Sequence, residues 1–354
     1  MNFVFRVDSS YKIGSGHLMR CLVLANSLSA AGHQISFICR NHEGDISKSL
    51  IKSKFKLNLL DNNNLEPSYD NTNSWLGVSQ EQDALQTINY LKDSVCDWLI
   101  VDHYCIDKLW QKRLRKYTNK ILVIDDLANR AHDCDILVDS NYVKGYKTRY
   151  QDILNKSCLE LLGPNYCFIS EEFKNHKLRS PKRTGEVKKV LIYFGGVDQF
   201  NLTRKCIEAF STNKLENIKL EVVVGAMNKD YENLKSIASK KKSIILHRSL
   251  PTLSKLMSSV DLSIGAGGVT TWERMFLGLP SIIIAIADNQ IAGAEELSKN
   301  KFVSYLGFHS ELSAKNLRDS ICKKIEKPND LLNESCVGQI LVDGNGISRM
   351  MECL

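Results

Sequence analysis

A histidine stands where a strand is expected to lead into a helix, in the segment RVDSSYKIGSGHLMR. The apolar run NFVFRV predicts a strand, and the spacing of apolar residues from His17 to Ala31 predicts an amphipathic helix, with Gly14 and Gly16 between the two. The positive end of a helix favours a neutral imidazole, which can take a proton from water. Taken alone, His17 is better explained as a helix cap or as a partner of a backbone carbonyl. It is a candidate general base that needs support from other residues.

A second glycine-rich loop follows the strand-like run DLSIGA. Gly265, Gly267 and Gly268 allow backbone N–H groups to approach an anion closely, and Thr270 or Thr271 can cap the helix that follows. Exposed N–H groups, hydroxyls and a positive helix end together suit a diphosphate. We therefore expect a nucleotide diphosphate at this loop.

Two neighbouring features each have two interpretations. Glu273 falls in the first turn of the helix after the loop, where it either stabilises the helix dipole or accepts hydrogen bonds from ribose hydroxyls. Gly195 and Gly196 end the strand-like run VLIYFGG, and form either a second part of the anion site or a plain strand-to-helix turn.

A dinucleotide cofactor is disfavoured. The third position of a G-x-G-x-x-G pattern beginning at Gly14 is occupied by Met19, and the next strand ends in Arg40 and Asn41 rather than in an acidic residue. We therefore expect no cofactor.

Polar side chains gather after four of the expected strands. Because parallel strands end at a common edge of the sheet, such residues predict a polar ligand site there. They are Asp102, His103 and Tyr104, then Asp125 and Asp126, then Asp139 and Asn141, and finally Asp288, Asn289 and Gln290.

The elements that must position these residues form two successive series of strands and helices, typical of parallel sheets. The fold class is therefore α/β, with two Rossmann-like domains facing across a cleft. We expect a domain over residues 1–165, a linker over 166–187, a second domain over 188–330, and a closing loop and helix over 331–354.

Composition excludes several classes of protein. The chain has 354 residues, and its longest apolar run, SIIIAIA, is far too short to span a membrane. The N-terminus lacks the apolar stretch of a signal peptide, and the 11 cysteines include no CxxC pair, so we expect a reducing, cytoplasmic location. Neither zinc-finger spacing nor a basic cluster with aromatic residues occurs, which disfavours a metal site and a nucleic-acid partner, although the net charge is +7.

The sequence resembles a known family, the UDP-2,4-diacetamido-2,4,6-trideoxy-β-L-altropyranose hydrolases of pseudaminic acid biosynthesis. The matching motifs are RVDSSYKIGSGHLMRCLVLA, IVDHYCID, YFGGVDQFNLT, GAGGVTTWE and ADNQ, in order along the chain. The second half also resembles the peptidoglycan glycosyltransferase that uses UDP-N-acetylglucosamine. The resemblance implies the glycosyltransferase-B fold, with UDP held mainly by the C-terminal domain.

Carried over residue by residue, the resemblance implies a catalytic role for His17, supported by Tyr104 and Asn289. The residues expected to bind UDP are Gly16, Gly195, Gly196, Gly267, Gly268, Val269, Thr270 and Glu273.

The resulting hypothesis is an inverting, metal-independent UDP-sugar hydrolase, expected to be a monomer, in a pathway leading to surface polysaccharide or flagellin glycosylation. Its substrate would be a UDP-linked 2,4-diacetamido-2,4,6-trideoxyhexose. Two alternatives stay open. One is a glycosyltransferase of the same fold, which would need an acceptor site. The other is a non-catalytic sensor of nucleotide sugars, which leaves the strand-end clusters unexplained.

Overall fold

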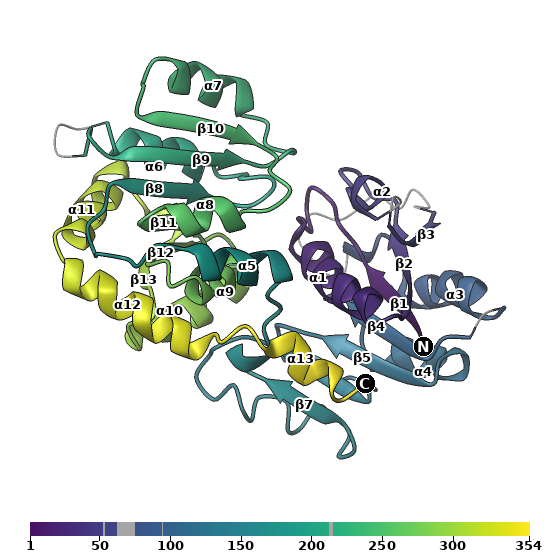
Figure 1. Ribbon diagram of the computed structural model, residues 1–354. Helices are drawn as coiled ribbons and strands as arrows, with labels where there is room; N and C mark the ends of the chain where they lie inside the picture. The colour runs from purple at the N-terminus through teal and green to yellow at the C-terminus, as the bar shows by residue number, and fades with distance from the viewer. Residues whose placement is uncertain (52–53, 62–74, 94, 212–214) are drawn as a thin grey trace. The chain divides into compact units, whose positions relative to one another are not determined.

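The computed structural model describes residues 1–51, 54–61, 75–93, 95–211 and 215–354. The chain divides into two compact units, each built around one parallel sheet (Figure 1). Unit 1 comprises residues 1–141, 145–168 and 346–354, and unit 2 comprises residues 142–144 and 169–345.

The sheet of unit 1 has seven parallel strands within the described residues, in the order β3-β2-β1-β4-β5-β6-β7. Its central strands are buried on both faces, as their nearly continuous apolar sequences require. The strands are β1 (Asn2–Val7), β2 (Gln34–Arg40), β3 (Lys56–Leu60), β4 (Trp98–Asp102), β5 (Lys120–Ile124), β6 (Ile136–Asp139) and β7 (Leu159–Leu162).

Helices cover both faces of this sheet. On one face α1 and α13 pack with Phe3 and Phe5 of β1, and on the other α3 and α4 pack with Val4. The helices of unit 1 are α1 (Gly16–Ala30), α2 (Ser47–Leu50), α3 (Gln80–Leu91), α4 (Lys108–Leu114) and α13 (Gly346–Met351), with short 3₁₀ turns at Arg115–Tyr117 and Pro164–Tyr166.

The sheet of unit 2 repeats the same connectivity, in the order β10-β9-β8-β11-β12-β13 over the part of the chain that the structure describes. In both units the strand order reverses beside the first strand, at β1/β4 and at β8/β11. Such a switch point is where ligands of doubly wound sheets bind, beyond the carboxyl ends of the strands. The strands are β8 (Lys189–Tyr193), β9 (Lys219–Val224), β10 (Ile244–Arg248), β11 (Leu262–Ala266), β12 (Ser281–Ala285) and β13 (Ser304–Phe308).

The helices of unit 2 pack around its sheet and against one another. α6 and α11 share a core with β8 and β11, α5 packs on α8, and α12 packs on α9. They are α5 (Glu171–Arg179), α6 (Leu202–Ala209), α7 (Tyr231–Ser239), α8 (Ser254–Ser259), α9 (Thr270–Phe276), α10 (Ile291–Lys299), α11 (Ala314–Ile325) and α12 (Pro328–Leu341), with 3₁₀ turns at Asp288–Gln290 and His309–Glu311.

The predicted pair of α/β sheets is confirmed. Two connecting segments contain more helix than the sequence predicted. The segment expected as a linker, 166–187, contains α5, a polar helix with the single buried apolar residue Phe173. The segment 331–354 contains most of α12 as well as α13, which belongs to unit 1. Gly346 permits this return of the chain, since a Cβ there would lie 2.2 Å from the carbonyl oxygen of Cys167. No helix among the described residues is long and apolar enough to cross a membrane.

A buried ionic cluster joins α3 to the first two strands of unit 1. The Asp83 carboxylate, fully buried, accepts hydrogen bonds from Arg6 at 2.6 Å, Arg40 at 2.6 Å and the Trp110 indole at 3.0 Å. Burial by itself raises the pKa of Asp83, but the charges of Arg6 and Arg40 outweigh it and hold the pKa below its ordinary value. The cluster is therefore balanced only while Asp83 is ionised.

Replacing Asp83 with asparagine is expected to lower the free energy of unfolding by about 3–5 kcal/mol, because it leaves two buried guanidinium groups without their shared carboxylate. A carboxylate with a depressed pKa stabilises the protein above its unfolded-state pKa, and this contribution is lost as the pH falls through the lower, folded-state pKa. The difference between wild type and variant should therefore be full at pH 7 and shrink below about pH 4. Urea unfolding at several pH values measures it. Asp93→Asn, at an exposed position just after the same helix, should change the free energy by less than about 0.5 kcal/mol.

Candidate active site

His17 lies at the beginning of α1, directly after the loop that leaves β1. Gly14 has a φ of 76°, a left-handed conformation that favours glycine, and it lets the chain turn back before α1 begins at Gly16. Ser15 precedes the helix and makes no side-chain cap. The His17 side chain is largely buried, with 10% of its surface exposed.

The His17 ring is paired with a buried carboxylate. His17 Nδ1 lies 2.6 Å from Asp102 Oδ1. Arg20, one turn along α1, donates to the same carboxylate from Nε at 2.6 Å and from Nη2 at 2.7 Å. Burial alone would raise the pKa of Asp102, but Arg20 and His17 hold it well below its ordinary value.

This pairing assigns the tautomer of the imidazole. An ionised carboxylate only accepts hydrogen bonds, so His17 Nδ1 carries the proton that faces Asp102. In the neutral ring the other nitrogen, Nε2, carries a lone pair that can accept a proton. The arrangement matches the base and orienting carboxylate found in acyl-transfer triads.

The topology of the sheet brings the two residues together. β1 and β4 are separated by about 90 residues of chain yet pair directly, with Val7 opposite Asp102. α1 starts from the end of β1, and Asp102 is the last residue of β4. His17 and Asp102 therefore meet at the switch point of the unit 1 sheet.

Tyr104 packs on the histidine instead of bonding to it. Its ring meets the His17 ring edge-on, with centroids 4.5 Å apart and an interplanar angle of 83°. Its hydroxyl donates to Asp126 Oδ2 at 2.7 Å, and Asp126 is also paired with Arg20. Burial and the charge of Asp126 raise the pKa of Tyr104 well above its usual range, so it stays a neutral hydrogen-bond donor.

The other strand-end residues of unit 1 continue this polar network. Asn141 donates to Asp126 at 3.0 Å and to Asp139 at 2.8 Å, and Tyr150 bonds to Asp125 at 2.9 Å. Burial, together with the negative charge of Asp126, raises the pKa of Asp139 to about 7, although Arg149 opposes the shift. The expectation that these residues share one edge of the sheet is confirmed.

His103 departs from that expectation. It is buried, its Nδ1 accepts from the backbone N–H of Cys105 at 3.1 Å, and its Nε2 lies 3.3 Å from Asp8 Oδ2. Burial lowers the pKa of His103, while Asp8 raises it less strongly. This histidine supports the Arg6–Asp8 pair inside unit 1 and is not turned toward His17.

In unit 2, the glycine loop after β11 is held by the side chain of Gln290. Gly267 N–H donates to Gln290 Oε1 at 3.2 Å, and Ile286 N–H donates to the same oxygen at 3.1 Å. Gly267 was expected to bind UDP, but its N–H already has this internal partner. Gly268, by contrast, faces open space, since no atom lies within 4 Å of the position of an added Cβ. The next backbone N–H groups, from Gly268 to Thr270, lead into α9.

The threonines of this loop do not cap α9. The helix begins at Thr270 after Val269, with no side-chain cap, and the Thr271 hydroxyl accepts a hydrogen bond from Arg274 at 2.9 Å. Glu273 lies in the first turn as expected. Burial raises its pKa to about 7, partly opposed by Arg274. Burial, together with the charge of Glu273, raises the pKa of Tyr193, at the end of β8, to about 12.

The loop after β8 differs from the anion site that we considered. Asp198 accepts hydrogen bonds from the backbone N–H groups of Leu202 and Thr203, both at 2.9 Å, and so caps α6 with a carboxylate. Gly195 has a φ of 85° and borders open space, whereas Gly196 packs against Gly225, whose added Cβ would lie 2.2 Å from the Gly196 carbonyl oxygen. The α6 end of this loop is therefore already neutralised, and only Gly195 keeps an open side.

Asn289 lies in the 3₁₀ turn after β12, between Asp288 and Gln290. Because the Gln290 side chain bonds to Gly267, this turn is tied directly to the glycine loop. The structure thus brings Asn289 into the same region of unit 2 as Gly268, Val269 and Thr270.

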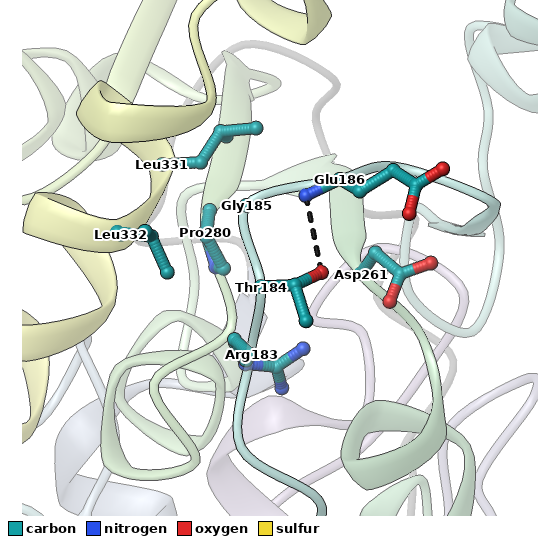
Figure 2. Close-up of a pocket in the computed structure, with 8 residues that line it drawn as sticks. All are labelled: Arg183, Thr184, Gly185, Glu186, Asp261, Pro280, Leu331 and Leu332. Carbon is teal, nitrogen blue, oxygen red and sulfur yellow. Dashed lines mark hydrogen bonds between the residues drawn. The ribbon is translucent and has the colours of Figure 1, made fainter.

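A pocket on unit 2 lies away from all of these residues. It is lined by Arg183, Asp261 and Pro280 among others, at the amino ends of β11 and β12 (Figure 2). Arg183 donates to the carbonyls of Met257, Val260 and Leu277 at the ends of α8 and α9. This arginine holds helix termini together, and the pocket is on the edge of the sheet opposite the carboxyl ends.

Three residues that build the sites were not predicted for those roles. Asp102 was named only as one of several strand-end residues, Arg20 was not named, and Gln290 was named without a partner. The signal for Arg20 was its spacing, one turn after His17 on the same face of a helix.

The chain is similar to a glycosyltransferase domain family and to a UDP-sugar hydrolase. Residues 190–337 match the family model of the glycosyltransferase family 28 C-terminal domain. The chain is 27% identical over 304 residues to the UDP-2,4-diacetamido-2,4,6-trideoxy-beta-L-altropyranose hydrolase of Campylobacter jejuni, with 85% of this chain and 98% of that protein aligned. It is 29% identical over 292 residues to an uncharacterised protein of Methanocaldococcus jannaschii, covering 80% of this chain but only 55% of that longer protein.

Among solved structures, MurG of Acinetobacter baumannii superposes with a TM-score of 0.64 at 12% identity, covering 100% of this chain and 99% of that one. A likeness at this identity shows the fold, and with it the expected glycosyltransferase-B class is confirmed. Residues 190–337 thus match the model of the glycosyltransferase family 28 C-terminal domain, and the whole chain has the glycosyltransferase-B fold and is similar in sequence to a UDP-2,4-diacetamido-2,4,6-trideoxy-beta-L-altropyranose hydrolase.

Proposed function

We propose that this protein hydrolyses a UDP-linked 2,4-diacetamido-2,4,6-trideoxyhexose, releasing UDP and the free sugar. The observation that carries the proposal is the His17–Asp102 pair at the switch point of unit 1. It is supported by the sequence relationship to a hydrolase of this substrate class and by the family 28 domain in unit 2.

In this mechanism His17 Nε2 takes a proton from a water molecule as the water oxygen attacks the anomeric carbon. The bond from that carbon to the diphosphate oxygen breaks, and UDP leaves as an anion. A single displacement inverts the configuration of the anomeric carbon. Asp102 holds the ring and stabilises the imidazolium that forms, in the way a carboxylate does beside a catalytic histidine.

The proposal assigns nucleotide binding to unit 2. The N–H groups from Gly268 to Thr270 would meet the diphosphate, Glu273 would accept hydrogen bonds from the ribose, and Asn289 would contact the sugar. Gly16 and Gly195 remain proposed contacts because both border open space. UDP is a good leaving group and backbone donors can stabilise its charge, so we propose that no metal ion is required.

The decisive experiment incubates the purified protein with the UDP-sugar, without any acceptor, and follows the anomeric NMR signals. We expect UDP release, a first-formed sugar of inverted configuration, and equal rates with and without EDTA. Retained configuration would contradict the single displacement, and a loss of rate in EDTA would contradict metal independence.

A glycosyltransferase is the second candidate, favoured by the family 28 domain and by the fold. Failure to release UDP in the absence of an acceptor, with release restored by an added acceptor, would support it against the hydrolase. The His17–Asp102 pair would then deprotonate an acceptor hydroxyl in place of water.

A further inference from the structure

The peptide between Ala266 and Gly267 is bound on both of its edges. Its carbonyl oxygen accepts a hydrogen bond from Arg274 Nη2 at 2.7 Å, and its N–H donates to Gln290 Oε1 at 3.2 Å. The C=O and N–H of a trans peptide point in opposite directions. The two side chains therefore fix the orientation of the glycine loop (residues 265–269) from opposite sides.

The Arg274 side chain contacts this loop on the side of the Ala266 carbonyl and is almost completely buried, at 1% exposure. Its side chain extends back from α9 toward the start of the helix, and Nη2 also donates to Thr271 Oγ1 at 2.9 Å. An added Cβ at Gly265 would lie only 2.7 Å from Arg274 Nη1. The glycine at position 265 thus makes room for the guanidinium.

The charge of this guanidinium is incompletely balanced. Its hydrogen bonds go to a carbonyl and a hydroxyl, neither of which carries a charge, and Nε has no hydrogen-bond partner among the described residues. Burial lowers the pKa of Arg274 to about 10, while the neighbouring Glu273 opposes this. A buried cation without a bonded carboxylate is costly, because no bonded counter-charge offsets its lost hydration.

We propose that Arg274 is a positioning residue of the nucleotide site, which holds the glycine loop by the Ala266 carbonyl and attracts a diphosphate through the loop by its charge. The inference rests on the proposed function only in taking UDP as the ligand. Arg274 need not touch UDP. It leaves the N–H groups that follow Gly267 for the ligand and adds a fixed positive charge behind them.

The test compares the affinities of UDP and uridine, because only UDP carries the diphosphate. In Arg274→Met we expect the dissociation constant of UDP to rise on the order of tenfold to a hundredfold, as for a unit charge a few ångströms away in a partly screened interior. The dissociation constant of uridine should change by less than about twofold, and Arg274→Lys, which keeps the charge, should preserve most of the preference for UDP. Isothermal titration calorimetry measures all of these values.

Arg183→Met is the matched control. It removes a partly buried guanidinium of unit 2 that also binds backbone carbonyls, but at the amino ends of the strands. It should leave the ratio of UDP to uridine affinity unchanged. Equal losses of UDP and uridine binding in Arg274→Met would mean a merely structural arginine and would overturn the proposal.

If Arg274→Met does not fold, Arg274→Gln takes its place, since an amide can still donate to the Ala266 carbonyl without a charge. Arg274→Gln should lose the preference for UDP, and a variant that keeps it would overturn the role of the charge. If wild-type protein binds UDP no better than uridine, the proposed function fails together with this inference. If the wild type prefers UDP and Arg274→Met prefers it equally, only the role of Arg274 fails.

Discussion

Replacing His17 with alanine is expected to reduce turnover of the UDP-sugar by about 100- to 10,000-fold, the usual contribution of a general base. The ring that takes the proton from water is removed, while the residues proposed to bind UDP lie in unit 2 except for Gly16, which offers only its backbone. The dissociation constant of UDP should therefore stay within about twofold of the wild-type value. Single-turnover assays and calorimetric titration with UDP measure the two quantities separately.

His33→Ala is the matched control for this prediction. His33 packs against Phe3 in a tilted arrangement just before β2, at the amino edge of the unit 1 sheet, so its loss should leave turnover unchanged. Near-normal turnover in His17→Ala would remove the central assignment of the mechanism. Asparagine at position 17 should be as inactive as alanine, because an amide cannot serve as a base.

Replacing Asp102 with asparagine is expected to lower kcat by about 100- to 10,000-fold, with KM changed much less. Arg20 donates to both carboxylate oxygens, so the amide nitrogen of the new side chain faces a guanidinium N–H in either orientation, and the amide has no charge to stabilise an imidazolium on His17. When that nitrogen takes the place of Oδ1, it also faces His17 Nδ1 and donates to it. This moves the ring proton to Nε2, the nitrogen that must accept a proton from water.

Asp97→Asn is the matched control for this prediction, because Asp97 and Asp102 lie at opposite ends of β4. Asp97 precedes β4 and accepts from the backbone N–H of Asn2 at 2.7 Å, a bond that asparagine can also accept. It should retain wild-type turnover. Equal kcat in wild type and Asp102→Asn, with the variant folded by circular dichroism, would show that His17 does not depend on this carboxylate.

Much of the fold could be predicted because most strands are continuous apolar runs, such as NFVFRV before His17 and SIIIA before Asn289. Buried parallel strands require such runs, so the central strands of both sheets could be recognised directly. The edge strands β3, β7 and β13 escaped prediction because they are short and partly exposed. α3 escaped because seven of its twelve residues are polar, although Ser79 caps it with a complete capping box.

The candidate site was predicted in part for a similar reason. Polar residues directly after apolar runs predicted which side chains would reach the carboxyl edge, and His17, Tyr104 and Asp126 do meet there. Partnerships could not be predicted, because hydrogen-bond acceptors depend on which strands are neighbours. Gly267 and Asp198 are two examples. The N–H of Gly267 already donates to Gln290, and the Asp198 carboxylate already accepts from the first turn of α6, near Gly195.

The linear order of residues, by itself, determined that this chain forms two α/β units and places a histidine at the first strand-to-helix turn. Apolar periodicity and glycine positions are local properties, and they are readable without knowing any distant contact. Only the tertiary structure decided that Asp102 orients His17 and that Arg274 and Gln290 hydrogen-bond to the glycine loop. His17 and Asp102 are 85 residues apart in the sequence, and Arg274, Gln290 and the glycine loop belong to three separate segments. Their contacts therefore form only once the parallel strands have taken their order in the sheet.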